Sequence, residues 1–289
     1  MTQLAILSDI HGNLPALEAV LNDLAQFKVD QVIVAGDVIN WGPFSAPVLE
    51  RVVREGWPVI RGNNEFYLLD YNTPRALGEW SNLGQWPMLP WLHRQLNGRW
   101  QKVIAAWPDT LSLRFGDAPP LRVVHGSPRS AFEAMHSTNT DAELTAMLAG
   151  VEETTVVAGH THLALDRRVD GWHLLNSGTV GIPLNGRVGE VCYLLLEGDA
   201  TGWHPTWRYL NYDLGPVFAE FARQGFVDEC GIVGHFVIAE YKTARLNLLP
   251  FLRWRAATCP TAPFSADLLE PFSKANIWDY TPPAYHVNL

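Results

Sequence analysis

The sequence predicts an α/β fold built around a partly parallel sheet. Three short apolar runs, at residues 4–7, 32–35 and 58–60, have the length and composition of buried strands. Helical patterns separate these runs, so that strand and helix alternate near the start of the chain. A chain of 289 residues with 47% hydrophobic residues can bury a large core. We therefore expect right-handed βαβ units with a parallel sheet region.

Two helices are expected between these strands. Pro15 opens the first, and apolar residues recur at helical spacing from Leu17 to Leu24. The second has a helical pattern through Val48, Leu49, Val52 and Val53. Both patterns describe helices that turn one apolar face toward the sheet.

Residues 72–108 interrupt the alternation. Tryptophans are interleaved there with prolines and glycines, without a strand period: Trp80, Trp86, Trp91, Trp100 and Trp107. We expect a partly helical insertion over one end of the sheet, and we favour packing over substrate binding as the role of its aromatic rings.

Apolar strands return at residues 121–125 and 154–158. Between them, Thr140 and Glu143 have the spacing of a capping box, which predicts a helix start. Alternating apolar and polar residues from 163 to 196 predict an antiparallel sheet.

Helical patterns reappear beyond Tyr212, and the last thirty residues, rich in proline and aromatic residues, are expected to wrap the surface. We divide the chain into a domain at 1–210, with the insertion at 72–108, and a helical extension at 211–289 packed on the same domain.

Charge and composition exclude several classes of function. The formal net charge of −9 argues against binding of a nucleic-acid polymer or an anionic membrane. A small phosphorylated substrate remains compatible, because bound divalent cations would reverse the local field. No apolar run has the length of a membrane span.

The cysteines and the N-terminus favour a cytoplasmic protein. Cys192, Cys230 and Cys259 lie far apart and form no CxxC pair, which is a poor framework for disulfides or a zinc site. The first residues run directly into a strand pattern without the basic and apolar regions of a signal peptide. The oligomeric state is not predicted.

Metal-competent side chains follow five predicted strands, at the point where each strand ends. They are Asp9, His11, Asp37, Asn63, His125, His160 and His162. Because ligands bind at the carboxyl ends of strands in open α/β sheets, we expect these side chains to converge at one edge. The spacing of Asp9 and His11 would let both leave an extended backbone on one face.

This mixture of oxygen and imidazole groups predicts a site for two divalent cations. Mn²⁺ is the expected ion, with Fe, Zn²⁺ and Ni²⁺ as alternatives, because Ca²⁺ prefers oxygen alone. Taken singly, each aspartate or histidine is more often a turn former or a structural residue. Their joint placement at five strand ends favours the metal interpretation.

The order of these motifs resembles the calcineurin-like metallophosphoesterase superfamily. Its bacterial phosphodiesterase branch opens with Ser-Asp-Ile-His-Gly-Asn, which stands here at residues 8–13. The similarity continues through Gly-Asn-Asn-Glu at 62–65 and Gly-His-Thr-His at 159–162, and covers about residues 3–197. It implies an α/β (α+β) fold, a four-layer α-β-β-α sandwich of two mixed sheets.

The resemblance also implies roles for the ligands. Asp9, His11 and His162 would hold one ion. Asn63, His125 and His160 would hold the other, and Asp37 would bridge the two. A hydroxide between the ions would attack phosphorus in line with the leaving group.

One residue departs from the family pattern. Where relatives carry a histidine that protonates the leaving oxygen or steadies the phosphate, this chain has Asn64. An amide cannot deliver a proton near neutral pH. We expect a substrate with an acidic leaving group, such as a nucleotide phosphate or an activated aryl ester, unless His93 or His136 supplies the proton.

Two further residues have open roles. Arg61 resembles an arginine of the protein-phosphatase and diadenosine-tetraphosphate hydrolase branches, so it either touches phosphate or pairs with Glu65 or a helix end. Trp41 either stacks on an aryl group or nucleobase or, as we favour, packs in the fold.

Three functions remain in competition. The first is hydrolysis of a small phosphodiester or a nucleotide-type phosphate. The second, a serine/threonine-type phosphoprotein phosphatase, follows from the similarity around Arg61. The third is a catalytically weak, metal-bearing scaffold or binding protein, which Asn64 alone supports.

Overall fold

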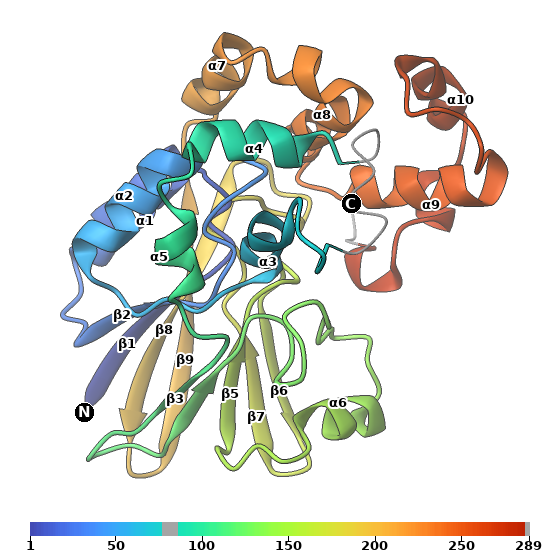
Figure 1. Ribbon diagram of the computed structural model, residues 1–289. Helices are drawn as coiled ribbons and strands as arrows, with labels where there is room; N and C mark the ends of the chain where they lie inside the picture. Colours follow the sequence, from blue (N-terminus) through green and yellow to red (C-terminus); the bar gives the residue numbers. More distant parts are fainter. Residues whose placement is uncertain (77–85, 287–289) are drawn as a thin grey trace.

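The computed structural model describes residues 1–76 and 86–286 of the chain (Figure 1). Within these residues the chain forms two mixed sheets with helices on their outer faces. The first sheet has the order β2-β1-β8-β9 and the second has the order β3-β4-β5-β7-β6. The predicted sandwich of two mixed sheets is confirmed.

The first sheet joins the N-terminal strands to a long hairpin. Its strands are β1 (Thr2–Leu7), β2 (Gln31–Val34), β8 (Glu190–Asp199) and β9 (Gly202–Asn211). β1 pairs with β2 in parallel, as the alternation of strands and helices predicts, and β8 pairs antiparallel with both β1 and β9. The predicted third strand at 58–60 is wrong in extent. Only Val59 forms a bridge, to Val34, because Pro58 has no N–H to donate and the chain turns almost at once into a helix.

The second sheet comes from the middle of the chain. Its strands are β3 (Leu111–Leu113), β4 (Leu121–Val123), β5 (Thr155–Ala158), β6 (Leu165–Val169) and β7 (Trp172–Asn176). β5 lies parallel to β4 and β7, and β6 and β7 form a hairpin. The segment 163–196 therefore does not form one antiparallel sheet. It supplies strands to both sheets, because alternation shows which face of a strand is buried and not which strand it pairs with.

Buried residues form one core between the sheets and one on each outer face. Leu4, Ile6, Val123 and Val157 are among those between the sheets. The outer face of the first sheet packs against α1 (Leu14–Leu24), α2 (Ser45–Glu55) and α5 (Gln101–Ala105), and that of the second packs against α6 (Asp141–Leu148). Thr140 caps α6 in the predicted capping box.

The remaining helices gather beyond one end of the sheets, where Figure 1 shows them together. They are α3 (Asn63–Asp70), α4 (Met88–Leu96), α7 (Gly215–Arg223), α8 (Phe226–Thr243), α9 (Leu248–Thr258) and α10 (Leu269–Ser273). Met88 and Trp91 of the insertion share a core with α7, α8 and α9. The insertion is partly helical as predicted, while its Trp80 lies outside the described residues. None of the helices in the described ranges is long and apolar enough to cross a membrane.

Candidate metal centre and its cavity

The loops after the strands have an unusual backbone at the predicted ligands. Positive φ angles, from 49° at His11 to 68° at His160, occur at Asp9, His11, Asp37, His160 and His162. The expectation that Asp9 and His11 leave an extended backbone is therefore wrong. Backbone hydrogen bonds from Asp9 N to Gly36 O (3.1 Å) and from His11 N to Asp37 O (2.9 Å) hold both loops in this form. Such strain in non-glycine residues persists where surrounding contacts fix it, and it is common at functional sites.

The first predicted group of ligands is assembled. Asp9, His11 and His162 each offer a ligand atom, and these atoms all lie within 4.8 Å of one another. The Oδ1 atom of Asp9 is 3.3 Å from Nε2 of His162 and 3.8 Å from Nε2 of His11. The loops that follow β1 and β5 are thus brought together, although His11 and His162 are 151 positions apart in the sequence.

The second group lies beside the first. Ligand atoms of Asp37, His125 and His160 also lie within 4.8 Å of one another. The Oδ1 atom of Asn63 is 3.0 Å from Nε2 of His125 and 2.8 Å from Nδ1 of His160. All three side chains predicted for this group therefore point to one place.

Asp37 stands between the two groups. Its Oδ2 atom is 3.5 Å from Nε2 of His11 and 3.4 Å from Nε2 of His125. One carboxylate oxygen thus reaches a nitrogen of each group. This is the geometry expected of a carboxylate shared by two cations.

Neighbouring groups orient the ligand side chains. The Nδ1 atoms of His125 and His162 lie 2.8 Å and 2.7 Å from the carbonyl oxygens of Ala35 and Ile182. A carbonyl only accepts, so each Nδ1 carries the proton and each Nε2 can present a lone pair to a cation. Ser8 Oγ donates to Asp9 Oδ2 at 2.6 Å and fixes that carboxylate.

The chemistry of the donor set fits cations. Asp9 Oδ1 and His11 Nδ1 are buried without a hydrogen-bond partner. Burial opposes charge on His125, yet the Asp37 carboxylate raises its pKa to about 10. Burial likewise opposes charge on Asp37, yet His125 holds the pKa of Asp37 below its ordinary value. A buried carboxylate that stays charged and stabilises positive charge on a neighbouring imidazole would also stabilise a metal cation.

Asn64 has a fixed amide orientation. Its Oδ1 atom accepts from Trp41 Nε1 at 3.0 Å and from Asn40 Nδ2 at 2.8 Å. Because an indole nitrogen only donates, the amide oxygen must face Trp41. The amide nitrogen therefore points to Asp37, where it donates to Oδ2 at 2.6 Å. Asn64 thus holds the Asp37 carboxylate, and Trp41 takes part in positioning as well as packing.

Glu65 holds the backbone of the loop that carries Asp37, a role that the sequence analysis did not assign to it. Its buried carboxylate accepts from the backbone N–H groups of Asp37, Val38 and Ile39, and from that of Gly62. The sequence signal for this role is that Glu65 is the third helical residue after the N-cap residue Gly62, the position from which a glutamate side chain accepts the backbone N–H of the N-cap. Gly62 itself passes so close that a Cβ atom there would lie 2.2 Å from Asp37 Oδ1.

Arg61 and His93 lie away from this centre. Arg61 pairs with Asp109 at 2.6 Å and stacks over Phe66, so the alternative pairing with Glu65 is wrong. The His93 ring contacts the Leu68 carbonyl oxygen at 3.2 Å and packs on Tyr71. Neither residue is among the described ones that line the cavity over the metal centre, whereas His136 is.

This cavity has a volume of about 590 Å³ and opens directly onto the ligand side chains. His11, Asp37, Asn63, His160 and His162 line its floor. Its other lining residues come from α3, from the loops that carry Trp41 and Ile182, from the segments around Trp86 and Phe132, and from the C-terminal extension. The extension therefore contributes to the site, which its sequence did not reveal.

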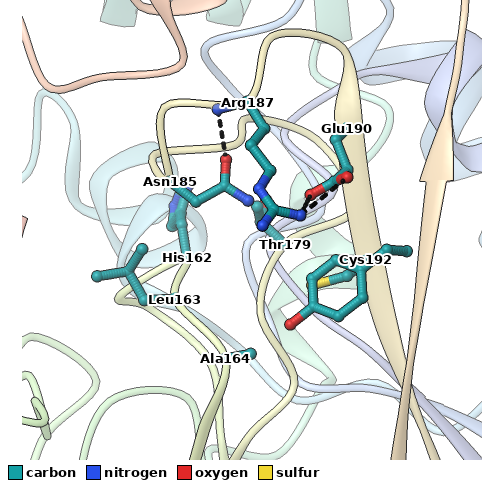
Figure 2. Close-up of a pocket in the computed structure, with 9 residues that line it drawn as sticks. His162, Leu163, Ala164, Thr179, Asn185, Arg187, Glu190 and Cys192 are labelled. Carbon is teal, nitrogen blue, oxygen red and sulfur yellow. Dashed lines mark hydrogen bonds and ion pairs between the residues drawn. The ribbon is translucent and has the colours of Figure 1, made fainter. Parts of the chain in front are cut away.

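His162 also lines a second cavity, of about 370 Å³ (Figure 2). An ion pair between Arg187 and Glu190 lies in its wall at 3.2 Å, beside Cys192. Burial raises the pKa of the Cys192 thiol to about 12, so this group is a weak nucleophile at neutral pH.

Comparison with known proteins agrees with this geometry. Residues 2–200 match the family model of the calcineurin-like phosphoesterase superfamily domain. Phosphodiesterase YfcE of Escherichia coli (strain K12) is 29% identical over 210 residues, which cover 69% of this chain and 89% of that protein.

Two solved structures share the fold. A metallophosphoesterase from Sphaerobacter thermophilus is 22% identical with a TM-score of 0.66, and the match covers 84% of this chain and 99% of that one. Hypothetical protein PH1004 from Pyrococcus horikoshii OT3 is 17% identical with a TM-score of 0.71, and the match covers 86% of this chain and 100% of that one. In both cases the match extends well beyond the length of the family domain.

Proposed function

The chain belongs to the calcineurin-like phosphoesterase superfamily, and we propose that it is a two-cation enzyme of this family. Its substrate in this proposal is a small phosphodiester or a nucleotide-type phosphate, which it hydrolyses. The membership and the similarity to a phosphodiesterase make the chain a phosphoesterase. The observation that carries the two-cation proposal is the position of Asp37 Oδ2, within 3.5 Å of a nitrogen in each ligand group.

In this proposal the seven strand-end side chains hold the cations. Asp9, His11 and His162 would hold one, Asn63, His125 and His160 would hold the other, and Asp37 would contribute to both. Cations bound there supply Lewis-acid chemistry, which lowers the pKa of water and neutralises charge on phosphoryl oxygens. The Asn64 amide keeps the Asp37 carboxylate aligned by its hydrogen bond to Oδ2.

No protonated imidazole stands at position 64 to assist the departing oxygen. Asn64 lines the cavity, but its amide nitrogen is engaged with Asp37. We propose that the leaving group is acidic enough to depart without a proton from this position. Substrates with such leaving groups include nucleotide phosphates and activated aryl esters.

The alternative function of a phosphoprotein phosphatase was suggested by the sequence around Arg61. This residue does not support it, because Arg61 pairs with Asp109 and is not among the described residues that line the cavity. The scaffold alternative rests on Asn64, which here has a positioning role beside an assembled ligand set. Small-molecule hydrolysis is the function that the geometry favours.

The test is hydrolysis of bis-para-nitrophenyl phosphate by protein loaded with Mn²⁺. We expect turnover that disappears with a chelator and returns with added metal, because the buried ligand set needs cations to bind an anion. Protein that binds Mn²⁺ yet releases para-nitrophenol no faster than buffer would instead establish the scaffold role.

A further inference from the structure

One wall of the cavity over the metal centre is aromatic. It consists of Trp41, Tyr67, Trp86 and Phe132. Tyr67 stacks on Trp86 with ring centroids 5.9 Å apart and meets the edge of Phe132 at 5.6 Å. Trp41 connects this wall to the metal centre, since its ring lies edge-on to His11 at 6.4 Å and its indole nitrogen is fixed on Asn64. The four rings therefore line the same cavity as the candidate metal ligands, and Trp41 contacts one of these, His11.

Aliphatic side chains of the C-terminal extension line the same cavity. They are Leu246, Leu248, Leu249 and Leu252, accompanied by Pro282 and Tyr285. Tyr285 also meets His136 edge-on, with ring centroids 5.3 Å apart. The extension thus adds an apolar surface above the cations, where hydrophobic burial can contribute to binding.

Positive charge in the cavity is sparse. Among the described lining residues, Arg253 is the one arginine or lysine, and the carboxylate of Glu240 lines the cavity too. Two cations can neutralise one phosphate group on the floor of the site. A chain of several phosphates would need further basic side chains along its path, and the aromatic and leucine surfaces do not supply them.

We propose that the substrate carries one phosphate, esterified to an apolar group of ring size that binds between the aromatic wall and the leucines of the extension. This inference rests on the proposed phosphoesterase function and narrows it. It favours aryl-type esters over dinucleoside polyphosphates. The cavity of about 590 Å³ has room for such a group above the phosphate.

The test compares two diesters that share a leaving group. Phenyl para-nitrophenyl phosphate and methyl para-nitrophenyl phosphate each carry one negative charge and differ in the group that would occupy the apolar space. After division by the uncatalysed rates, we expect kcat/KM to be at least about tenfold higher for the phenyl ester, since even one methylene in a fitted pocket changes kcat/KM by about that factor.

Leu249→Gln tests the proposed surface. Leu249 lines the cavity and is only partly buried, so a variant with glutamine, which has a similar size, should fold. It should lower kcat/KM for the phenyl ester more than kcat/KM for the methyl ester, and so reduce the preference between the two. Leu269→Gln on α10 is the matched control, because Leu269 belongs to the same extension and lies outside the cavity lining. It should retain the wild-type preference.

Equal kcat/KM for the two esters in the wild type would overturn the inference. A kcat/KM for diadenosine tetraphosphate above that for the phenyl ester would overturn it too. A binding measurement separates this failure from failure of the proposed function. With Mn²⁺ bound, phenylphosphonate should bind more tightly than methylphosphonate by calorimetry, whether or not either ester is hydrolysed. Equal affinity would contradict the apolar site even in an active enzyme.

Discussion

Asn64 departs from the family pattern, which has a histidine at this position, and it also makes hydrogen bonds that orient the site. Its amide oxygen faces Trp41 and Asn40, and its amide nitrogen faces Asp37. The residue therefore has a positioning role, and it leaves the departing oxygen without a proton donor at this position.

Asn64→His should change how the rate depends on the leaving group. An imidazolium can give a proton to the departing oxygen, whereas the amide cannot. Across aryl phosphodiesters of graded leaving-group pKa, we expect log kcat/KM to fall steeply with pKa in the wild type and less steeply in the variant. Identical slopes would show that protonation from position 64 is irrelevant to this enzyme.

Glu65 should be essential for stability rather than for chemistry. Its carboxylate accepts from four backbone N–H groups, those of Asp37, Val38, Ile39 and Gly62. Glu65→Ala leaves these buried donors without their partner, which we expect to lower the free energy of unfolding by roughly 3 kcal/mol or more. Urea denaturation measures the change.

Glu270→Ala is the control for this loss, because Glu270 lies on the surface with its side chain 74% exposed. It should change the free energy of unfolding by less than about 0.5 kcal/mol. Similar small effects at both positions would mean that the Asp37 loop does not depend on Glu65.

At the scale of elements, Glu240 joins two helices of the extension. It lies on α8, and its Oε1 atom accepts from the backbone of Asn247 at 2.9 Å and of Leu248 at 3.0 Å, where α9 begins. Burial raises the pKa of this carboxyl to about 7, against the opposing effect of these two hydrogen bonds. The folded protein therefore retains a proton that the unfolded chain releases at lower pH.

This difference predicts the sign of a pH dependence. Between the ordinary glutamate pKa of 4.5, which applies to the unfolded chain, and the folded pKa of about 7, the folded state binds more protons than the unfolded state. The contribution of Glu240 to stability therefore falls as pH rises through this range. Glu240→Gln keeps an oxygen acceptor without a charge. We expect its urea midpoint to decline less than that of the wild type from about pH 5 to about pH 7.5. Parallel declines in both proteins would refute the assignment.

Some of the strands and helices could be predicted from the sequence alone. Periodicity and capping predicted β1, α1 and α6, because each is fixed by residues close together in the chain. The placement of polar residues after strands predicted that these side chains converge, since strand ends share one edge. Neither signal could reveal that Leu249 and Tyr285 lie over the metal centre, because that depends on packing between segments far apart in sequence.

At the scale of the whole molecule, the insertion and the extension form one body above the metal centre. Met88 and Trp91 pack in a single core with Val217, Phe226 and Phe251. The left-handed backbone at the ligands is likewise a property of the assembled molecule, imposed by hydrogen bonds between loops that follow different strands. Local propensity does not encode it.

The proposal of two cations makes metal content the decisive quantity. Wild-type protein saturated with Mn²⁺ and freed of excess metal should carry about two ions per chain by mass spectrometry, because it has two adjacent ligand groups. His162→Ala should lose the ion of its own group and retain the other. Asp109→Ala, which removes a surface carboxylate paired with Arg61, should retain both ions.

The most direct test is Asp37→Ala in the same measurement. Because Asp37 Oδ2 reaches both groups, we expect this one substitution to weaken both ions and to leave fewer than one per chain, while the fold, followed by circular dichroism, persists. A folded Asp37→Ala protein that still holds two Mn²⁺ ions as firmly as the wild type would contradict the account.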